Sequence, residues 1–167
     1  MWIEPLNARH ALDYRALMLE AYDLHPQAFT SSVRERAAMP LSWWESRLTS
    51  TLEVVLGAFE DGKLAGIVGL AFDPREKARH KVTLFGMYVS GQVRQRGVGY
   101  QLVQAALAEA QKHPELRLIQ LTVTAGNEAA FNLYQRCGFV QFGLEPLAVR
   151  VGEDYFDKIH MWRELTA

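Results

Sequence analysis

Val93-Arg94-Gln95-Arg96-Gly97-Val98-Gly99-Tyr100 is the stretch of this chain that says most about its fold. An apolar, strand-like run at 82–89 precedes it, and a helical pattern at 101–111 follows it. Glycines at a strand-to-helix junction let backbone N–H groups approach an anion closely. The start of the helix adds unpaired donors and the positive end of the helix dipole. The stretch therefore predicts a binding site for a diphosphate.

Two common phosphate-binding motifs do not fit this stretch. A dinucleotide-binding loop needs G-x-G-x-x-G after its first strand, but the third glycine position is Leu102 and the stretch lies past the middle of the chain. A P-loop needs G-x-x-x-x-G-K followed by Ser or Thr, and the sequence contains no such string. The remaining pattern, [Arg/Gln]-x-x-Gly-x-[Gly/Ala], is filled by Arg94, Gly97 and Gly99. It resembles the coenzyme A loop of the GCN5-related N-acetyltransferase (GNAT) superfamily.

A second block, at 127–139, resembles the next signature of the same superfamily: Asn, then Ala, then Leu-Tyr, then Gly-Phe. Asn127 can cap the start of a helix, and Gly138 suits its left-handed end. Asn127 and Tyr134 are seven residues apart, so both project from one helical face. The two blocks occur in the expected order, with room between them for one helix and one strand. The order of the expected elements extends the resemblance over essentially the whole chain, but its specific residues lie between Met87 and Phe139.

The rest of the chain predicts the elements that such a fold requires. Asn7 caps a first helix that ends before His25-Pro26, and Asp61-Gly62 is a type I′ hairpin signal. We expect an irregular connection at 26–32. The expected helices run from about 8 to 24, 40 to 49, 101 to 111 and from 127 onward; the expected strands are 2–6, 53–59, 63–72, 82–89, 116–123, 139–145 and 154–162.

The resemblance implies one α/β domain over residues 1–167. Its sheet would be mixed and mostly antiparallel, with a splayed central strand pair and flanking helices. In the resembled fold, the pantetheine arm of coenzyme A lies in that splay like an extra strand.

Composition excludes several other classes of protein. A chain of 167 residues with 49% hydrophobic content can bury a full core. The formal net charge of −1 gives no electrostatic case for binding nucleic acid or an anionic membrane. Cys137 is the single cysteine, and we find neither a signal pattern nor an apolar run long enough to cross a bilayer. We therefore expect a cytoplasmic protein, and the resemblance implies acetyl-CoA as co-substrate and no metal.

The resemblance also assigns roles to individual residues. Backbone groups of Met87 and Val89 would pair with pantetheine amides, and an N–H there would polarise the thioester carbonyl. Tyr134 would protonate the departing thiolate as the catalytic acid. The amine acceptor would attack the thioester directly in a ternary complex. The implied cofactor-binding residues are Met87, Val89, Arg94, Gln95, Arg96, Gly97, Val98, Gly99, Tyr100 and Asn127.

Each of these roles has an alternative. Arg94 and Arg96 can be solvated loop arginines, and Tyr134 can be a packing residue with a wet hydroxyl group. Asn127 can serve as an N-cap alone, or it can both cap the helix and bind the cofactor. Cys137 is more readily explained as a small packing residue than as a nucleophile.

The general base is not apparent from the sequence. Some members of the resembled superfamily carry a Glu on the strand before the loop, but no carboxylate occurs between Val82 and Val89. His80, His160 and Asp157 are the candidates. A chain of water molecules, or an acceptor that arrives as the neutral amine, would serve equally well.

The acceptor channel should lie outside the motifs, at 26–36 and 150–156. Phe29, Ser31, Ser32, Glu35 and Tyr155 are its candidate residues, and Glu35 would attract a cationic amine unless it belongs to a solvated helical turn. The sequence thus predicts an acetyl-CoA-dependent N-acetyltransferase acting on an unidentified primary amine, and a homodimer is compatible with this function. The alternative is a non-catalytic acyl-CoA binding or sensing module.

Overall fold

A seven-stranded sheet forms the centre of the computed structural model, which describes residues 1–91, 93 and 97–166. The strand order is β1-β2-β3-β4-β5-β7-β6, and every neighbouring pair is antiparallel except β4 and β5. This confirms the predicted mixed, mostly antiparallel α/β sheet. The strands are β1 (Trp2–Pro5), β2 (Glu53–Glu60), β3 (Lys63–Phe72), β4 (Lys81–Val89), β5 (Leu118–Thr124), β6 (Val140–Val151) and β7 (Asp154–Glu164).

Helices cover both faces of this sheet. One core lies between the sheet and α4 and α5, and includes Leu102 and Phe139. The other lies between the sheet and α1 and α3, and includes Tyr14 and the fully buried Trp44. The helices are α1 (Ala11–Leu24), α2 (Val33–Ala37), α3 (Leu41–Thr49), α4 (Val98–Gln111) and α5 (Glu128–Arg136), with short 3-10 turns η1 (Ala8–His10) and η2 (Pro26–Ala28).

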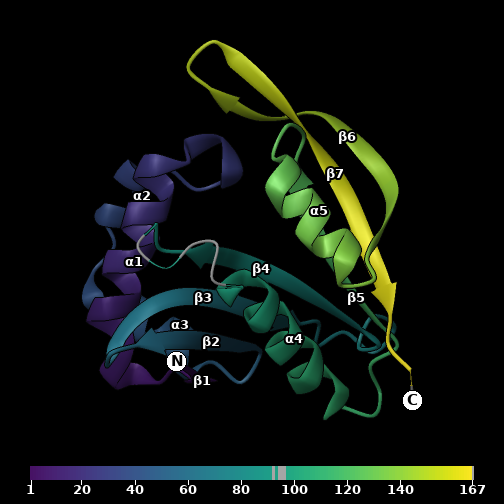
Figure 1. Cartoon of the computed structure of the whole chain (residues 1–167), viewed down its shortest axis with the longest axis horizontal. Helices are drawn as coiled ribbons and strands as arrows, with labels where there is room; N and C mark the ends of the chain where they lie inside the picture. The colour runs from purple at the N-terminus through teal and green to yellow at the C-terminus, as the bar shows by residue number, and fades with distance from the viewer. Residues whose placement is uncertain (92, 94–96, 167) are drawn as a thin grey trace.

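The two central strands β4 and β5 separate along their length. In the described part of the chain they pair in parallel where Lys81, Val82 and Thr83 face Leu118, Ile119 and Gln120. Beyond these residues the strands diverge, and the sheet opens into the two arms seen in Figure 1. The predicted splay of the central pair is therefore present.

A bulge in β4 changes which side chains face α4 and α5. Val82 and Leu84 belong to the core under these helices, and so do the later residues Met87 and Val89, which are an odd number of positions away. The pairing with β3 shifts at this point, and Gly86 has a φ of 61°. One extra residue in a strand reverses the alternation of its side chains. The bulge thus turns Met87 and Val89 toward the splay.

Two predicted turns are confirmed by their backbone angles. Asp61 and Gly62, between β2 and β3, both have positive φ, of 51° and 77°, as a type I′ turn requires. Gly138 follows α5 with a φ of 90°, which is the left-handed conformation expected at its end.

Two elements differ from the prediction. Helix α2 follows the connection expected at 26–32, where we listed no helix, although a helical turn at Glu35 was one of the alternatives; it begins with a capping box between Ser32 and Glu35. Strand β6 runs to Val151 rather than ending near Glu145, because an edge strand tolerates the missing N–H of Pro146 at an irregular stretch. Within the described ranges, no helix is long and apolar enough to span a membrane.

Candidate active site

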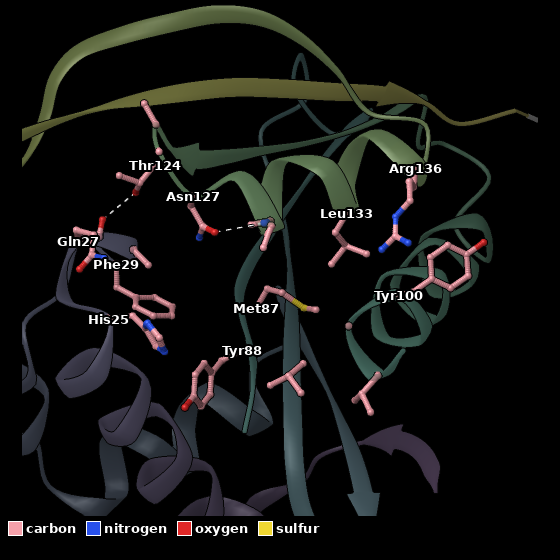
Figure 2. A pocket seen from close by; sticks show the side chains of 18 of the residues that line it. His25, Gln27, Phe29, Met87, Tyr88, Tyr100, Thr124, Asn127, Leu133 and Arg136 are labelled. Carbon is pink, nitrogen blue, oxygen red and sulfur yellow. Dashed lines mark hydrogen bonds between the residues drawn. The ribbon is translucent and has the colours of Figure 1, made fainter. Parts of the chain in front are cut away.

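A cavity of about 780 Å³ lies where β4 and β5 diverge. Met87 and Val89 of β4 line it, together with the start of α4 and the face of α5 that carries Leu133 (Figure 2). Of the predicted cofactor-binding residues, the structure gathers Met87, Val89, Gly97, Val98, Gly99, Tyr100 and Asn127 around this space. Arg94, Gln95 and Arg96, which we also expected here, lie outside the described residues.

The start of α4 borders the cavity with backbone donors. Gly97 is the N-cap in a left-handed conformation, with φ of 76°, and it supplies no side chain to cap the helix. The first-turn N–H groups of Val98, Gly99 and Tyr100 therefore have no intrahelical acceptor. A Cβ on Gly99 would lie 3.3 Å from side-chain atoms of Leu133 and Met87, so glycine allows α4 to pack closely here. Such a helix start suits a phosphate group.

Asn127 acts as the N-cap of α5, as the sequence predicted. Its side-chain oxygen accepts a hydrogen bond from the N–H of Ala130 at 3.3 Å, drawn as a dashed line in Figure 2. The same residue lines the cavity, so capping and ligand contact are compatible. Its predicted contact with the cofactor remains a prediction.

A hydrogen bond from a buried hydroxyl group joins two elements at one end of the first cavity. Thr124, at the end of β5, is 4% exposed and donates a hydrogen bond to the carbonyl oxygen of Gln27 at 2.8 Å (Figure 2). This bond ties η2 to the open end of the splay, with His25 and Phe29 beside it. The wall formed by η2 is thus fixed to the sheet.

A second cavity, of about 340 Å³, adjoins the first on the side of α1 and α2. Tyr134 of α5 lines it, as do Leu84 and Gly86 of β4. Seven residues line both cavities: Ala28, Phe29, Met87, Thr124, Asn127, Ala130 and Leu133. Two ligands bound in these cavities would therefore meet near Met87.

Tyr134 is almost completely enclosed. It is 5% exposed, and its ring packs edge-on against Phe139 at 5.9 Å between centroids. Burial raises the pKa of the Tyr134 hydroxyl group well above its usual range, and the neighbouring Cys137 thiol adds to this rise. The phenol therefore keeps its proton at neutral pH and is available as a donor. Its predicted role as the acid remains a prediction.

Cys137 is part of the core under α4 and α5 and is 4% exposed. Burial raises the pKa of its thiol, which disfavours the thiolate. This agrees with the packing role expected from the sequence.

The predicted acceptor residues separate into two groups. Phe29 and Ser31 line the second cavity. Ser32 and Glu35 lie outside the lining of both cavities, because their side chains form the capping box of α2, where hydrogen bonds from Ser32 lower the pKa of Glu35. Tyr155, at the tip of the β6–β7 hairpin, also lies outside both linings and is 52% exposed.

None of the three candidate general bases lines either cavity. His160 is paired with Glu145 at 2.8 Å, and Asp157 accepts a hydrogen bond from the N–H of Leu147 at 2.9 Å. His80 is exposed in the loop before β4. Among residues 1–91, 93 and 97–166, no group of three or more His, Cys, Asp or Glu side chains could hold a metal ion.

Several lining residues were not predicted from the sequence. His25 and Arg136 border the first cavity; Tyr14, Tyr22, Arg36, Arg47 and Lys158 border the second. Arg136 had a usable signal, since it is three residues after Leu133 on the same helical face. The residues of the second cavity come from α1, α2, α3 and β7, and no local pattern connects them.

Comparison with known proteins agrees with this arrangement. Residues 18–139 match the family described as "Acetyltransferase (GNAT) family". The chain belongs to this family. The resemblance that the two sequence blocks indicated is therefore confirmed.

The chain is also similar to individual GNAT proteins in sequence and in fold. The chain is 32% identical to the phosphinothricin N-acetyltransferase of Alcaligenes faecalis over 114 residues, which are 67% of this chain and 57% of that enzyme. The GNAT acetyltransferase of Streptococcus pneumoniae is 27% identical, with 99% of each chain covered and a TM-score of 0.79. The fold also matches that of the Salmonella typhimurium protein yncA, solved with its cofactor acetyl-CoA, at 20% identity, 100% and 95% coverage and a TM-score of 0.82.

Proposed function

We propose that this GNAT protein transfers the acetyl group of acetyl-CoA to a primary amine. The observation that supports this most is the pair of adjoining cavities, which share a wall at Met87, Asn127 and Leu133. A cofactor arm in the splay and an acceptor in the second cavity would bring thioester and amine together. Holding two reactants in this way replaces a bimolecular encounter.

The reaction proposed is direct transfer. The amine nitrogen attacks the thioester carbon, a C–N bond forms and the C–S bond breaks. The ammonium proton passes to water, the departing thiolate takes its proton from Tyr134 or through it, and the Tyr134 phenolate regains a proton from water. Tyr134 lines the second cavity close to the shared wall, and burial keeps its phenol protonated. A backbone N–H of β4 near Met87 would stabilise the negative charge on the carbonyl oxygen.

The cofactor would lie along the first cavity, with its diphosphate at the start of α4. The first-turn N–H groups of Val98, Gly99 and Tyr100 would bind the phosphate oxygens. Arg94 and Arg96 would add charge there, as the sequence motif predicts. Arg136 is on the wall of the same cavity, on the side of Tyr100, and could contact the cofactor (Figure 2).

The first test is whether acetyl-CoA stabilises the protein. A ligand at about 100 times its Kd adds about 2.7 kcal/mol, which raises the Tm of a domain of this size by about 5–10 °C. Arg94→Glu should reduce that rise. An unchanged Tm at saturating acetyl-CoA would contradict the proposal.

The second test measures release of free thiol with a panel of amines. The panel starts with phosphinothricin, the substrate in the name of the Alcaligenes relative. Stabilisation by acetyl-CoA together with thiol release supports acetyl transfer. Stabilisation without release from any amine supports the acyl-CoA sensing module instead.

A further inference from the structure

The second cavity carries positive charge that transfer to a simple amine does not require. Arg36, Arg47 and Lys158 line it, and none of its described lining residues is an Asp, a Glu or a His. An ammonium ion would be repelled there, and a neutral amine gains nothing from three cations. The charge therefore points to a second, anionic group on the acceptor.

Arg36 presents a donor without an acceptor. Its guanidinium carbon lies 4.5 Å from the centre of the Trp43 ring, and its Nε is buried with no hydrogen-bond partner among the described residues. Leaving a charged donor unsatisfied is costly. The helix that carries Arg36 is held in place because Arg15 of α1 donates a hydrogen bond to the carbonyl oxygen of Ala37 at 3.2 Å. The donor is thus positioned before any ligand arrives.

Arg47 lies against the same aromatic ring. Its guanidinium carbon is 5.3 Å from the centre of the Trp43 ring and 5.0 Å from that of Phe85. Its Nε donates to a carboxylate oxygen of Glu53 at 3.3 Å, so that carboxylate offsets part of one positive charge. Two planar guanidinium groups that share one ring can bind an oxyanion from two sides.

The positive charges of Arg36 and Arg47 affect the pKa values of Tyr14 and Tyr22 on the wall of the second cavity. Burial raises the pKa of Tyr22, and the charges of Arg36 and Arg47, together with a hydrogen bond between Tyr22 and Arg36, oppose that rise. Burial also raises the pKa of Tyr14 to about 12, with Arg47 the largest opposing influence. Both guanidinium groups are therefore close enough to Tyr22 for their charges to act on its hydroxyl group. A ligand oxygen in this space would also have neutral hydroxyl donors within reach.

We propose that the acceptor of this enzyme is an amine that also carries an anionic group, a carboxylate or a similar oxyanion, bound by Arg36 and Arg47. This rests on the proposed acetyl transfer. The amine then lies at the Met87 and Tyr134 end of the cavity, where it adjoins the first cavity. Lys158, which donates a hydrogen bond to Thr30 at 2.6 Å, adds a third positive charge.

The same cations would assist deprotonation of the acceptor. A positive charge near an ammonium group lowers its pKa, because the two like charges repel. The bound acceptor would thus lose its proton to water more readily than in solution. This accounts for a cavity whose described lining contains no carboxylate base.

The test compares matched acceptors with and without the anionic group. Thiol release from saturating acetyl-CoA is measured with L-methionine and 3-(methylthio)propylamine, with L-phenylalanine and 2-phenylethylamine, and with phosphinothricin. We expect kcat/KM to be about 10-fold or more higher for the acidic member of each pair. Arg36→Gln should lower kcat/KM about 10- to 100-fold for the acids and change it less than about 2-fold for the simple amines.

Two further variants control for folding and for charge. Arg34→Gln alters an exposed arginine of the same helix that lies outside both linings, and should leave all rates unchanged. Arg36→Lys keeps the charge but loses the planar fork, and should restore part of the activity. Because Arg36 does not line the first cavity, the Tm rise with acetyl-CoA should persist in every variant.

The outcomes separate the two proposals. If the wild type prefers the simple amines, or if Arg36→Gln affects both members of a pair equally, the anion site is wrong and acetyl transfer stands. If no amine releases thiol, the proposed transfer is contradicted, and the anion site with it.

Discussion

The two cavities on either side of Met87 are built in different ways. About half of the described residues that line the first come from two short stretches rich in small residues, the start of α4 and the start of α5 with the loop before it. The second takes its polar side chains from α1, α2, α3 and β7, which are far apart in the sequence. A cavity of the first kind binds the same cofactor in many proteins, because backbone donors do not change with the sequence. A cavity of the second kind changes its ligand when a few side chains change.

The largest effect that tests this contrast is expected at Tyr134, where the two cavities meet. Tyr134→Phe removes the proposed proton donor but keeps the ring that packs on Phe139. General acids contribute about 10²- to 10⁴-fold to rate, so we expect kcat to fall at least about 100-fold. The rise in Tm with acetyl-CoA should persist, because Tyr134 does not line the first cavity. Unchanged kcat across the pH range would show that Tyr134 is a packing residue.

A second prediction concerns the free energy of unfolding of the protein at high pH, which depends on Tyr14 in the wall of the second cavity. Burial raises the pKa of Tyr14 from 10.0 to about 12, so the folded protein holds this proton more tightly than the unfolded chain does. The stabilisation is complete below pH 10 and is lost as the pH rises towards about 12. The loss is about 2–3 kcal/mol in the free energy of unfolding, or about 1.4 kcal/mol per unit.

Urea unfolding of the wild type and Tyr14→Phe between pH 9 and about 12 measures this loss. The difference between the two curves isolates Tyr14 from the other groups that titrate there. Tyr155→Phe, at an exposed position of the β6–β7 hairpin, is the matched control. Parallel curves for wild type and Tyr14→Phe would mean that the second cavity is more open to water than the structure shows.

The smallest effect is expected in the first cavity, at Gly99. Gly99→Ala places a Cβ 3.3 Å from the ends of the Leu133 and Met87 side chains, which can move by the few tenths of an ångström required. Both side chains line the cavity, so their shift should raise the KM for acetyl-CoA about 3- to 10-fold with little change in kcat. Gly91→Ala, where an added Cβ meets nothing within 4 Å, is the control. A larger fall in kcat than in affinity would show that the first cavity is not the cofactor site.

The contrast also explains how much could be predicted from the sequence. The turn at Asp61-Gly62, the end of α5 at Gly138 and the capping by Asn127 depend on local backbone chemistry, and the structure agrees with all three. His25, in the wall of the first cavity, was missed, because η2 reaches the site through a long-range hydrogen bond from Thr124 to Gln27, a residue of the segment 26–36 expected near the site.

Only part of the second cavity could be predicted, since the segment expected at 26–36 supplies Phe29 and Ser31 to its lining. Glu35 was expected either to attract the acceptor or to belong to a helical turn. The structure agrees with the second alternative, because its side chain completes the capping box of α2 with Ser32, a local signal that the sequence contained and that we did not use. Arg36, the next residue, turns to the cavity instead. Its approach to Arg47 depends on how α2 and α3 pack around Trp43, and no spacing in the sequence encodes that contact.

The bulge at Gly86 has a consequence for how this protein can vary. The alternation of β4 reverses there. The number of residues between Val82 and positions 87 and 89, and not the kind of side chain at these positions, therefore decides that Met87 and Val89 face the cavity. Losing one residue from this stretch would move Tyr88, now in the opposite core, into the place of Met87. Substitutions along β4 adjust the site, whereas a change in its length would exchange the two faces of the strand. In this strand, length is under a stricter constraint than composition.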